Sequence, residues 1–158
     1  MVRAILDGRK TVTRRVVRPC VNRAPRCPYG VAGDQLWVRE TWWERGVKGD
    51  GLRYWEIKHD ADLATHELLM LRETGWKKKP SIFLSRADAR IVLAVQDVGI
   101  ERLQKIDEAG ARAEGFEDVA WFRILWDRIN AKRPRCSWAD NPWVWVVAFS
   151  LCDRDAGR

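Results

Sequence analysis

The chain has 158 residues, of which 46% are hydrophobic and 32% are charged, with a formal net charge of +7. This length and composition suit a soluble globular protein and exclude a disordered or fibrous chain. No apolar run approaches the ~18 residues of a membrane span, and none follows the N-terminus as in a secretion signal, so we expect a cytoplasmic protein without membrane contact. We expect one domain over residues 1–152 and a frayed C-terminal tail at 153–158.

The excess positive charge lies in the first 26 residues. Eight basic side chains there face one acid, Asp7, whereas residues 27–158 carry 21 basic and 21 acidic side chains. The basic side chains are Arg3, Arg9, Lys10, Arg14, Arg15, Arg18, Arg23 and Arg26. A block dominated by arginine is typical of a surface that binds phosphate or another anion, and a solvated basic arm is the alternative interpretation.

The same N-terminal segment carries signals of ordered structure. Its first apolar residues have near-helical spacing and predict a short helix that ends at Gly8, where a left-handed C-cap falls. The β-branched residues of 9–17 then predict a turn that passes into a strand. This places Lys10 and Thr13 close to the turn.

The middle of the chain predicts two strands and one helix. The strands are expected near 35–42 and 53–57, with a turn region over 46–51 between them. Residues 61–73 have a ragged apolar face that favours a helix, and the run Lys77-Lys78-Lys79-Pro80 ends it.

The C-terminal half alternates strand and helix. A long strand is expected over 89–103, and a buried one over the apolar run 143–149. Between them, Asp107 and Asp118 are expected to N-cap two helices, the first of which Gly115 closes. The second helix carries an apolar stripe that we interpret as core, formed by Phe122, Leu125, Trp126 and Ile129.

The order of these elements predicts an α+β fold. A twisted, mostly antiparallel sheet or small barrel would be covered by helices, and most of the ten tryptophans would lie in its core. The four cysteines and two histidines lack the spacing of a zinc site, so we expect no metal and no cofactor.

Four motifs, taken in chain order, carry a family resemblance. They are Gly8-Arg9-Lys10-Thr11-Val12-Thr13-Arg14-Arg15, the loop Cys27-Pro28-Tyr29-Gly30 with Gly33-Asp34 leading into Leu36-Trp37-Val38-Arg39-Glu40-Thr41-Trp42, then Ala113-Glu114-Gly115, and Asn141-Pro142-Trp143-Val144-Trp145. Together they resemble ASCH-domain proteins of the phage and prophage type. The resemblance implies a β-barrel similar to the PUA fold with covering helices, a bacterial host cell, and an association with RNA or modified nucleosides.

Some small members of that family are amidohydrolases that remove the acyl group of N4-acylated cytidine with a Lys, a Thr and a Glu. The resemblance places these on Lys10, Thr13 and Glu114. A neutral lysine can activate a hydroxyl if burial and neighbouring cations lower its pKa, and those cations would be Arg9, Arg14 and Arg15. Thr13 would attack the acyl carbon or position a water, while Glu114 holds Lys10 or relays a proton to the leaving amine.

The expected substrate- or nucleic-acid-binding residues surround this trio. They are Arg9, Arg14, Arg15, Arg39, Trp42 and Ser81. Relatives carry a short apolar strand before the position where this chain starts with Met1, so a late start codon or a truncation is expected. The sequence does not indicate an oligomeric state.

Two other functions stay open. One is a non-catalytic module that binds RNA or another single strand, with phosphate contacts from Arg14, Arg15, Arg18, Arg39 and Lys77 to Lys79. In that case an exposed Trp42 or Trp43 would stack on a base. The other is a metal-dependent ribonuclease in which Asp34, Glu40 and Glu114 gather around a cation.

Overall fold

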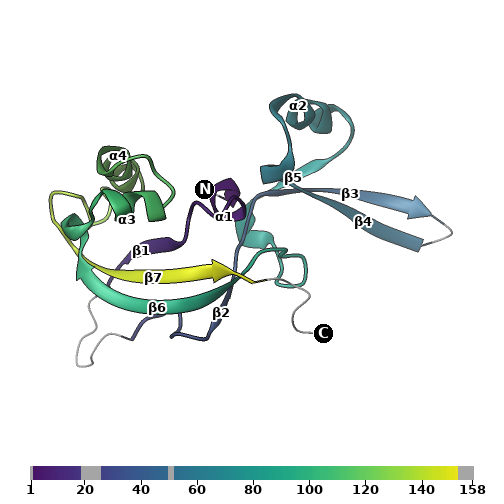
Figure 1. Ribbon diagram of the computed structural model, residues 1–158. Helices are drawn as coiled ribbons and strands as arrows, with labels where there is room; N and C mark the ends of the chain where they lie inside the picture. The colour runs from purple at the N-terminus through teal and green to yellow at the C-terminus, as the bar shows by residue number, and fades with distance from the viewer. Residues whose placement is uncertain (1, 19–25, 50–51, 153–158) are drawn as a thin grey trace. The chain divides into compact units, whose positions relative to one another are not determined.

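A computed structural model describes residues 2–18, 26–49 and 52–152. The protein is α+β, as predicted, and its main sheet is a curled, half-closed antiparallel sheet (Figure 1). Within the described part of the chain, no helix combines the length and the apolar character needed to cross a membrane. The predicted frayed tail at 153–158 lies outside the described residues.

The chain divides into two compact units. The first contains residues 3–36 and the chain from residue 92 onward, and the second contains residues 37–91. Each unit has its own sheet. The expectation of a single domain over 1–152 stays a prediction.

The first unit is built on a four-stranded sheet in the order β1-β7-β6-β2. Its strands are β1 (Val12–Val16), β2 (Gln35–Trp37), β6 (Val92–Arg102) and β7 (Trp143–Leu151). The long strands β6 and β7 pair antiparallel from Leu93↔Leu151 to Arg102↔Trp143, with a register shift between Val95 and Asp97. Such a bulge increases twist and bends the strand, and Figure 1 shows β6 and β7 curving together. The outer strand β1 pairs only with β7.

The helices of the first unit begin and end where the capping residues predict. They are α1 (Val2–Leu6), α3 (Glu108–Ala113) and α4 (Val119–Asn130), and a 3-10 turn, η3 (Leu103–Lys105), precedes α3. The Asp107 carboxylate accepts a hydrogen bond from the Gly110 N–H, and the Asp118 carboxylate accepts one from the Trp121 N–H. Gly8 follows α1 with a φ of 71°. The boundaries predicted at Gly8, Asp107 and Asp118 are therefore confirmed.

Both faces of the main sheet are covered, which explains the continuous apolar run in β7. Val144 packs with α3 and α4 in a cluster that also contains Leu103, Ile106, Ala111, Phe122 and Trp126. Its neighbour Trp145 points to the other face, where it packs with Val95, Val147, Tyr29 and Leu36. Alternate residues of a strand face opposite sides, so a strand buried on both sides has no polar alternation. The predicted buried strand is confirmed, except that Trp143 at its start is exposed.

The second unit has a three-stranded sheet in the order β4-β3-β5. Its elements are β3 (Trp42–Gly49), β4 (Leu52–His59), η1 (Asp60–Asp62), α2 (Thr65–Glu73), β5 (Lys77–Lys79) and η2 (Ser81–Phe83). Trp43, Leu63, Leu71 and Trp76 form one of its buried clusters. The predicted helix over 61–73 is present, although its first residues are a 3-10 turn.

Two predicted boundaries in this region were wrong. The strand expected over 35–42 is two strands in different sheets, because β2 ends at Trp37 and β3 begins at Trp42. The turn expected over 46–51 is mostly strand, since Gly46 pairs with Trp55 and the ladder continues to Gly49 opposite Leu52. Cross-strand pairing along this hairpin overrides the low strand propensity of its glycines.

The turn after α3 depends on Gly115, which has a φ of 87° and lies against the segment before β1. A Cβ added there would lie 3.2 Å from the Ala4 Cβ and 3.3 Å from the Lys10 Cβ. We expect Gly115→Ala to lower the free energy of unfolding by about 1–3 kcal/mol, as measured by denaturant titration. Gly99→Ala in β6 is the control, because nothing lies within 4 Å of its added Cβ. Equal losses in the two variants would contradict this account.

Candidate functional site

A buried ion pair joins Lys10 and Glu114, two residues 104 positions apart in the chain. Lys10 precedes β1 and Glu114 follows α3, and their backbones form an isolated antiparallel bridge. The side chains are only 3% and 4% exposed, and Lys10 Nζ donates a hydrogen bond to Glu114 Oε2. The structure thus brings two of the three predicted catalytic residues into direct contact.

Lys10 uses all of its hydrogen-bonding capacity in this site. Besides the Glu114 carboxylate, Nζ donates to the Glu114 carbonyl oxygen at 3.0 Å and to the Val12 carbonyl oxygen at 2.8 Å. Three acceptors match the three hydrogens of an ammonium group. The resting geometry is therefore that of a protonated lysine held in one position.

Burial acts against that protonated form. Loss of hydration lowers the pKa of Lys10, and the Glu114 carboxylate raises it. The positive charges of Arg15 and Arg14 lower it again, and the resulting pKa lies below the ordinary lysine value. The direction and these causes are those expected from the sequence. Arg9 is the exception among the expected cations, because it forms an exposed ion pair with Asp7.

Glu114 also ties α3 to the open edge of the main sheet. Its Oε1 accepts a hydrogen bond of 2.5 Å from the backbone N–H of Arg14 in the outer strand β1. An unpaired N–H on an outer strand needs a partner, and the carboxylate supplies it. The two oxygens of Glu114 therefore bind two different groups, the Lys10 ammonium and the edge of β1.

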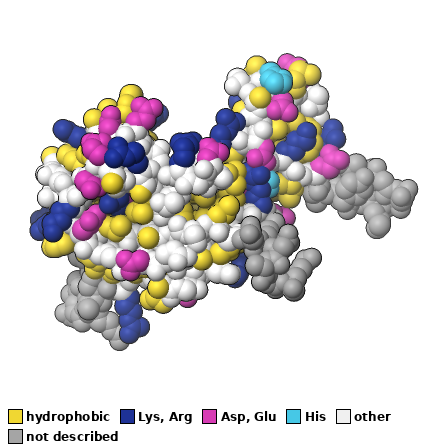
Figure 2. Space-filling view, viewed as in Figure 1, with side chains coloured by type: hydrophobic (Ala, Val, Ile, Leu, Met, Phe, Trp, Pro, Cys, Tyr) yellow, Lys and Arg dark blue, Asp and Glu magenta, His cyan; other side chains and the backbone are white. Residues whose placement is uncertain are grey.

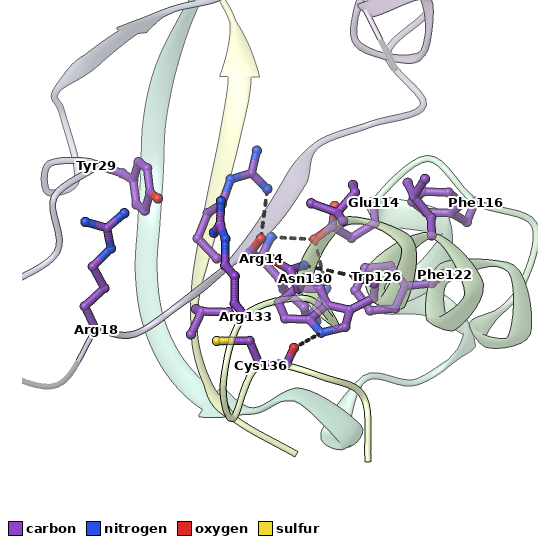
Figure 3. Close-up of a pocket in the computed structure, with 14 residues that line it drawn as sticks. Arg14, Arg18, Tyr29, Glu114, Phe116, Phe122, Trp126, Asn130, Arg133 and Cys136 are labelled. Carbon is purple, nitrogen blue, oxygen red and sulfur yellow. Dashed lines mark hydrogen bonds and ion pairs between the residues drawn. The ribbon is translucent and has the colours of Figure 1, made fainter. Parts of the chain in front are cut away.

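Arg14 is itself buried, with a side chain 7% exposed. Its Nε donates to Glu101 Oε1 at 2.9 Å. Its Nη1 lies 3.9 Å from Glu114 Oε1, which is beyond hydrogen-bond distance, and has no hydrogen-bond partner among the described residues. Figure 3 shows the Arg14 and Glu114 side chains in the same pocket.

Thr13, the third predicted catalytic residue, faces the other side of the sheet. Side chains alternate along β1, so Thr13 and Arg14 point to opposite faces, and Thr13 lies opposite Val147 in the ladder. The Thr13 hydroxyl accepts a hydrogen bond of 2.7 Å from Arg15 Nη1. Among the described residues, no hydrogen bond joins this hydroxyl to Lys10 or Glu114.

A pocket of about 650 Å³ lies along the free edge of β1 in the first unit (Figure 3). It is lined by Arg14, Arg15, Val16, Arg18, Tyr29, Glu114, Phe116, Phe122, Leu125, Trp126, Ile129, Asn130, Arg133 and Cys136. Lys10 and Thr13 are not part of this lining, so Glu114 is the predicted catalytic residue that the pocket reaches directly.

The apolar stripe of α4 forms one wall of this pocket. Phe122 and Trp126 are buried as core residues, whereas Ile129 is 53% exposed, so the interpretation of the whole stripe as core was wrong. Asn130, one residue beyond the stripe, is buried and donates to the Trp126 carbonyl oxygen. An amide residue directly after an apolar helical stripe is the sequence signal that could have indicated this wall. No comparable pattern in the sequence indicates Arg133 or Cys136.

The remaining predicted binding residues belong to the second unit. Arg39 stacks over the Trp37 ring at 4.6 Å and donates to the Ile82 carbonyl oxygen, and Ser81 begins η2. Trp42 and Trp43 are both buried, so the expected exposed tryptophan for base stacking is not found at either position. They are core residues because Trp43 packs with Leu63, Leu71 and Trp76, and Trp42 packs with Leu84 and Ala89.

The three carboxylates of the ribonuclease alternative each have their own partners. Asp34 accepts from the Val31 N–H, Glu40 is paired with Arg90, and Glu114 is paired with Lys10. Across residues 2–18, 26–49 and 52–152, no group of three or more His, Cys, Asp or Glu side chains is arranged to hold a metal ion. The described cysteines, Cys27, Cys136 and Cys152, are free, and Cys20 lies outside the described residues.

Comparison with known proteins adds no further assignment. No family model matches the chain, and neither curated proteins nor solved structures gave a match.

The Lys10–Glu114 pair makes stability depend on pH in a testable way. Glu114→Gln removes the carboxylate that raises the pKa of Lys10, so this pKa falls further. At pH values between the lowered pKa of Lys10 in the folded protein and its ordinary pKa in the unfolded chain, only the unfolded chain binds the proton. The free energy of unfolding therefore rises with pH in this range, by at most about 1.4 kcal/mol per pH unit. We expect this rise to begin at lower pH in Glu114→Gln than in the wild type, as measured by denaturant unfolding at a series of pH values.

Glu101→Gln is the matched control for that experiment. Glu101 binds Arg14 but makes no hydrogen bond to Lys10 in the described structure. Its variant should keep the pH dependence of the wild type. The same pH dependence in both variants would show that Glu114 does not set the protonation of Lys10.

Proposed function

We propose that this chain is an ASCH-domain protein with a PUA-like fold, directed at nucleosides or nucleic acid, and that it is an amidohydrolase for N4-acylated cytidine or a related modified nucleobase. The observation that carries the proposal is the buried contact between Lys10 and Glu114. The motifs assign these two residues to one site although 104 positions separate them, and the fold places them in contact. The same motifs support a cytoplasmic protein of phage or prophage origin in a bacterial host.

The pair supplies the proton transfers that amide hydrolysis needs. A neutral Lys10 accepts the proton of the attacking hydroxyl as the bond to the acyl carbon forms. When the bond between that carbon and N4 breaks, the proton passes to the departing amine through Lys10 or Glu114. The products are cytidine and a carboxylic acid. The lowered pKa of Lys10 favours this cycle because it makes the neutral amine easier to reach.

The attacking hydroxyl belongs either to a water or to Thr13, and the Thr13 route requires β1 to rearrange, because Thr13 faces away from Arg14 and Glu114 in this structure. Arg15 donates to the Thr13 oxygen, and a cationic donor stabilises the alkoxide that forms when this hydroxyl loses its proton. Attack by Thr13 creates an ester that water then cleaves, whereas attack by water needs Thr13 only for positioning. Turnover of a Thr13→Val variant distinguishes the two routes.

The test is a chromatographic assay of purified protein with N4-acetylcytidine. We expect the wild type to release cytidine, and we expect Lys10→Met and Glu114→Gln to lower kcat by at least about 100-fold, because each removes a proton-transfer group. Thr11→Val is the matched control for Thr13→Val: Thr11 is an exposed threonine two residues away and should tolerate the change. Thermal unfolding of each variant separates loss of chemistry from loss of fold.

A non-catalytic RNA-binding module is the second candidate, favoured by the four arginines that line the pocket. Binding through phosphate contacts weakens steeply with salt. Absence of turnover by a folded wild type, together with salt-sensitive binding of single-stranded RNA, would replace the amidohydrolase proposal with this one.

A further inference from the structure

The pocket contains a buried cation with unused hydrogen-bonding capacity. Arg14 is more than nine-tenths buried, lines the pocket, and its Nη1 has no hydrogen-bond partner among the described residues. A buried guanidinium nitrogen without a partner costs free energy unless a ligand supplies an acceptor. Glu114 does not supply it, because the separation from its Oε1 is 3.9 Å.

The charge of the pocket lining points to an anionic ligand. Four arginines line it, namely Arg14, Arg15, Arg18 and Arg133, against one carboxylate, Glu114. That carboxylate already faces Lys10, so the lining has a clear excess of positive charge. By contrast, Figure 2 shows basic and acidic side chains mixed over the viewed surface of α3 and α4. The excess in the pocket lining therefore differs from the mixed charges on the viewed surface of α3 and α4.

The other walls suit a flat, partly apolar group. Phe116 and Tyr29 are half-buried and lie on opposite faces of the main sheet, and Figure 3 shows the α4 side chains Phe122 and Trp126 on the side of Phe116. A volume of about 650 Å³ lies within the range of small-molecule sites. An aromatic base held beside arginines is a common arrangement for nucleotides, since the ring packs on apolar walls and the phosphate binds the guanidinium forks.

We propose that this pocket binds a phosphorylated pyrimidine, with the phosphate at Arg14 and the exposed Arg15 and Arg133, in preference to the uncharged nucleoside. The choice of cytosine as the base rests on the proposed function, whereas the phosphate preference rests on the pocket alone. The phosphate comes either from a free mononucleotide or from a nucleotide within an RNA strand. Both present the same chemistry to the arginines.

Calorimetric titration of the whole protein with cytidine, cytidine monophosphate, inorganic phosphate and a short single-stranded RNA tests this proposal. We expect cytidine monophosphate to bind at least about tenfold more tightly than cytidine, because a charge-assisted hydrogen bond contributes a factor of that size. Inorganic phosphate should bind more weakly than the nucleotide. Tighter binding of the RNA than of the mononucleotide would assign the phosphate to a strand, and the reverse order to a free nucleotide.

Arg133→Gln is the diagnostic variant, because Arg133 is exposed and its loss should not disturb the fold. It should weaken the binding of cytidine monophosphate more than that of cytidine, and so reduce the preference for the phosphorylated ligand. Arg123→Gln is the control: Arg123 is an exposed arginine of α4 that does not line the pocket. Arg14→Lys, which keeps the charge but not the fork, should also reduce the preference if the variant folds.

Three results would overturn the proposal. They are equal affinity for cytidine and cytidine monophosphate, equal affinity for inorganic phosphate and the nucleotide, and equal effects of the Arg133 and Arg123 variants. The deacylation assay stays independent of these titrations. Turnover of N4-acetylcytidine without a phosphate preference rejects this inference alone, and a phosphate preference without turnover rejects the proposed function alone.

Discussion

The first unit depends on the buried contact between Lys10 and Glu114. Removing two charges from water costs several kcal/mol per ion, and the mutual attraction offsets this only if the remaining donors and acceptors are satisfied. Here they are, because Lys10 Nζ also binds two carbonyl oxygens and Glu114 Oε1 binds the Arg14 N–H. A buried pair of this kind gives little net stability but strongly disfavours any arrangement that separates the partners. It therefore fixes where the end of α3 meets the segment before β1.

That connection also determines how the edge of the sheet is used. A free outer strand invites pairing with another chain, and proteins cover such edges in several ways. In β1 the Glu114 carboxylate covers the backbone N–H of Arg14. Just before the strand, the backbone N–H of Thr11 donates to the Ala113 carbonyl oxygen. Beyond that point Arg15 and Val16 line the pocket. Because the pocket follows a strand edge, it collects side chains from both faces of β1, such as Arg14 from one and Arg15 from the other.

Local signals predicted the elements well, and long-range packing decided the rest. The caps Asp107 and Asp118 act on backbone groups three residues away, so the sequence alone locates them. The motifs placed Lys10 with Glu114, although no local rule connects them. The direction of Thr13 was not predictable, because a one-residue shift in the pairing register of β1 on β7 reverses the face of every side chain in it. Burial of Trp42 likewise depends on distant residues, Leu84 and Ala89, that pack against it, and no local pattern predicts that contact.

The basic N-terminal segment shows that a local excess of charge in the sequence does not locate the anion-binding site in the folded protein. Its excess charge looks like one continuous surface, but folding divides it. Lys10 and Arg14 are buried against Glu114 and Glu101, and Arg9 is paired with Asp7. From the described segment, Arg15 and Arg18 stay exposed at the pocket, and Arg133 joins them from beyond α4. The capacity to bind an anion therefore comes from two segments that line the same pocket, β1 with the residues after it and the chain after α4. Arg14 is the buried cation of that pocket.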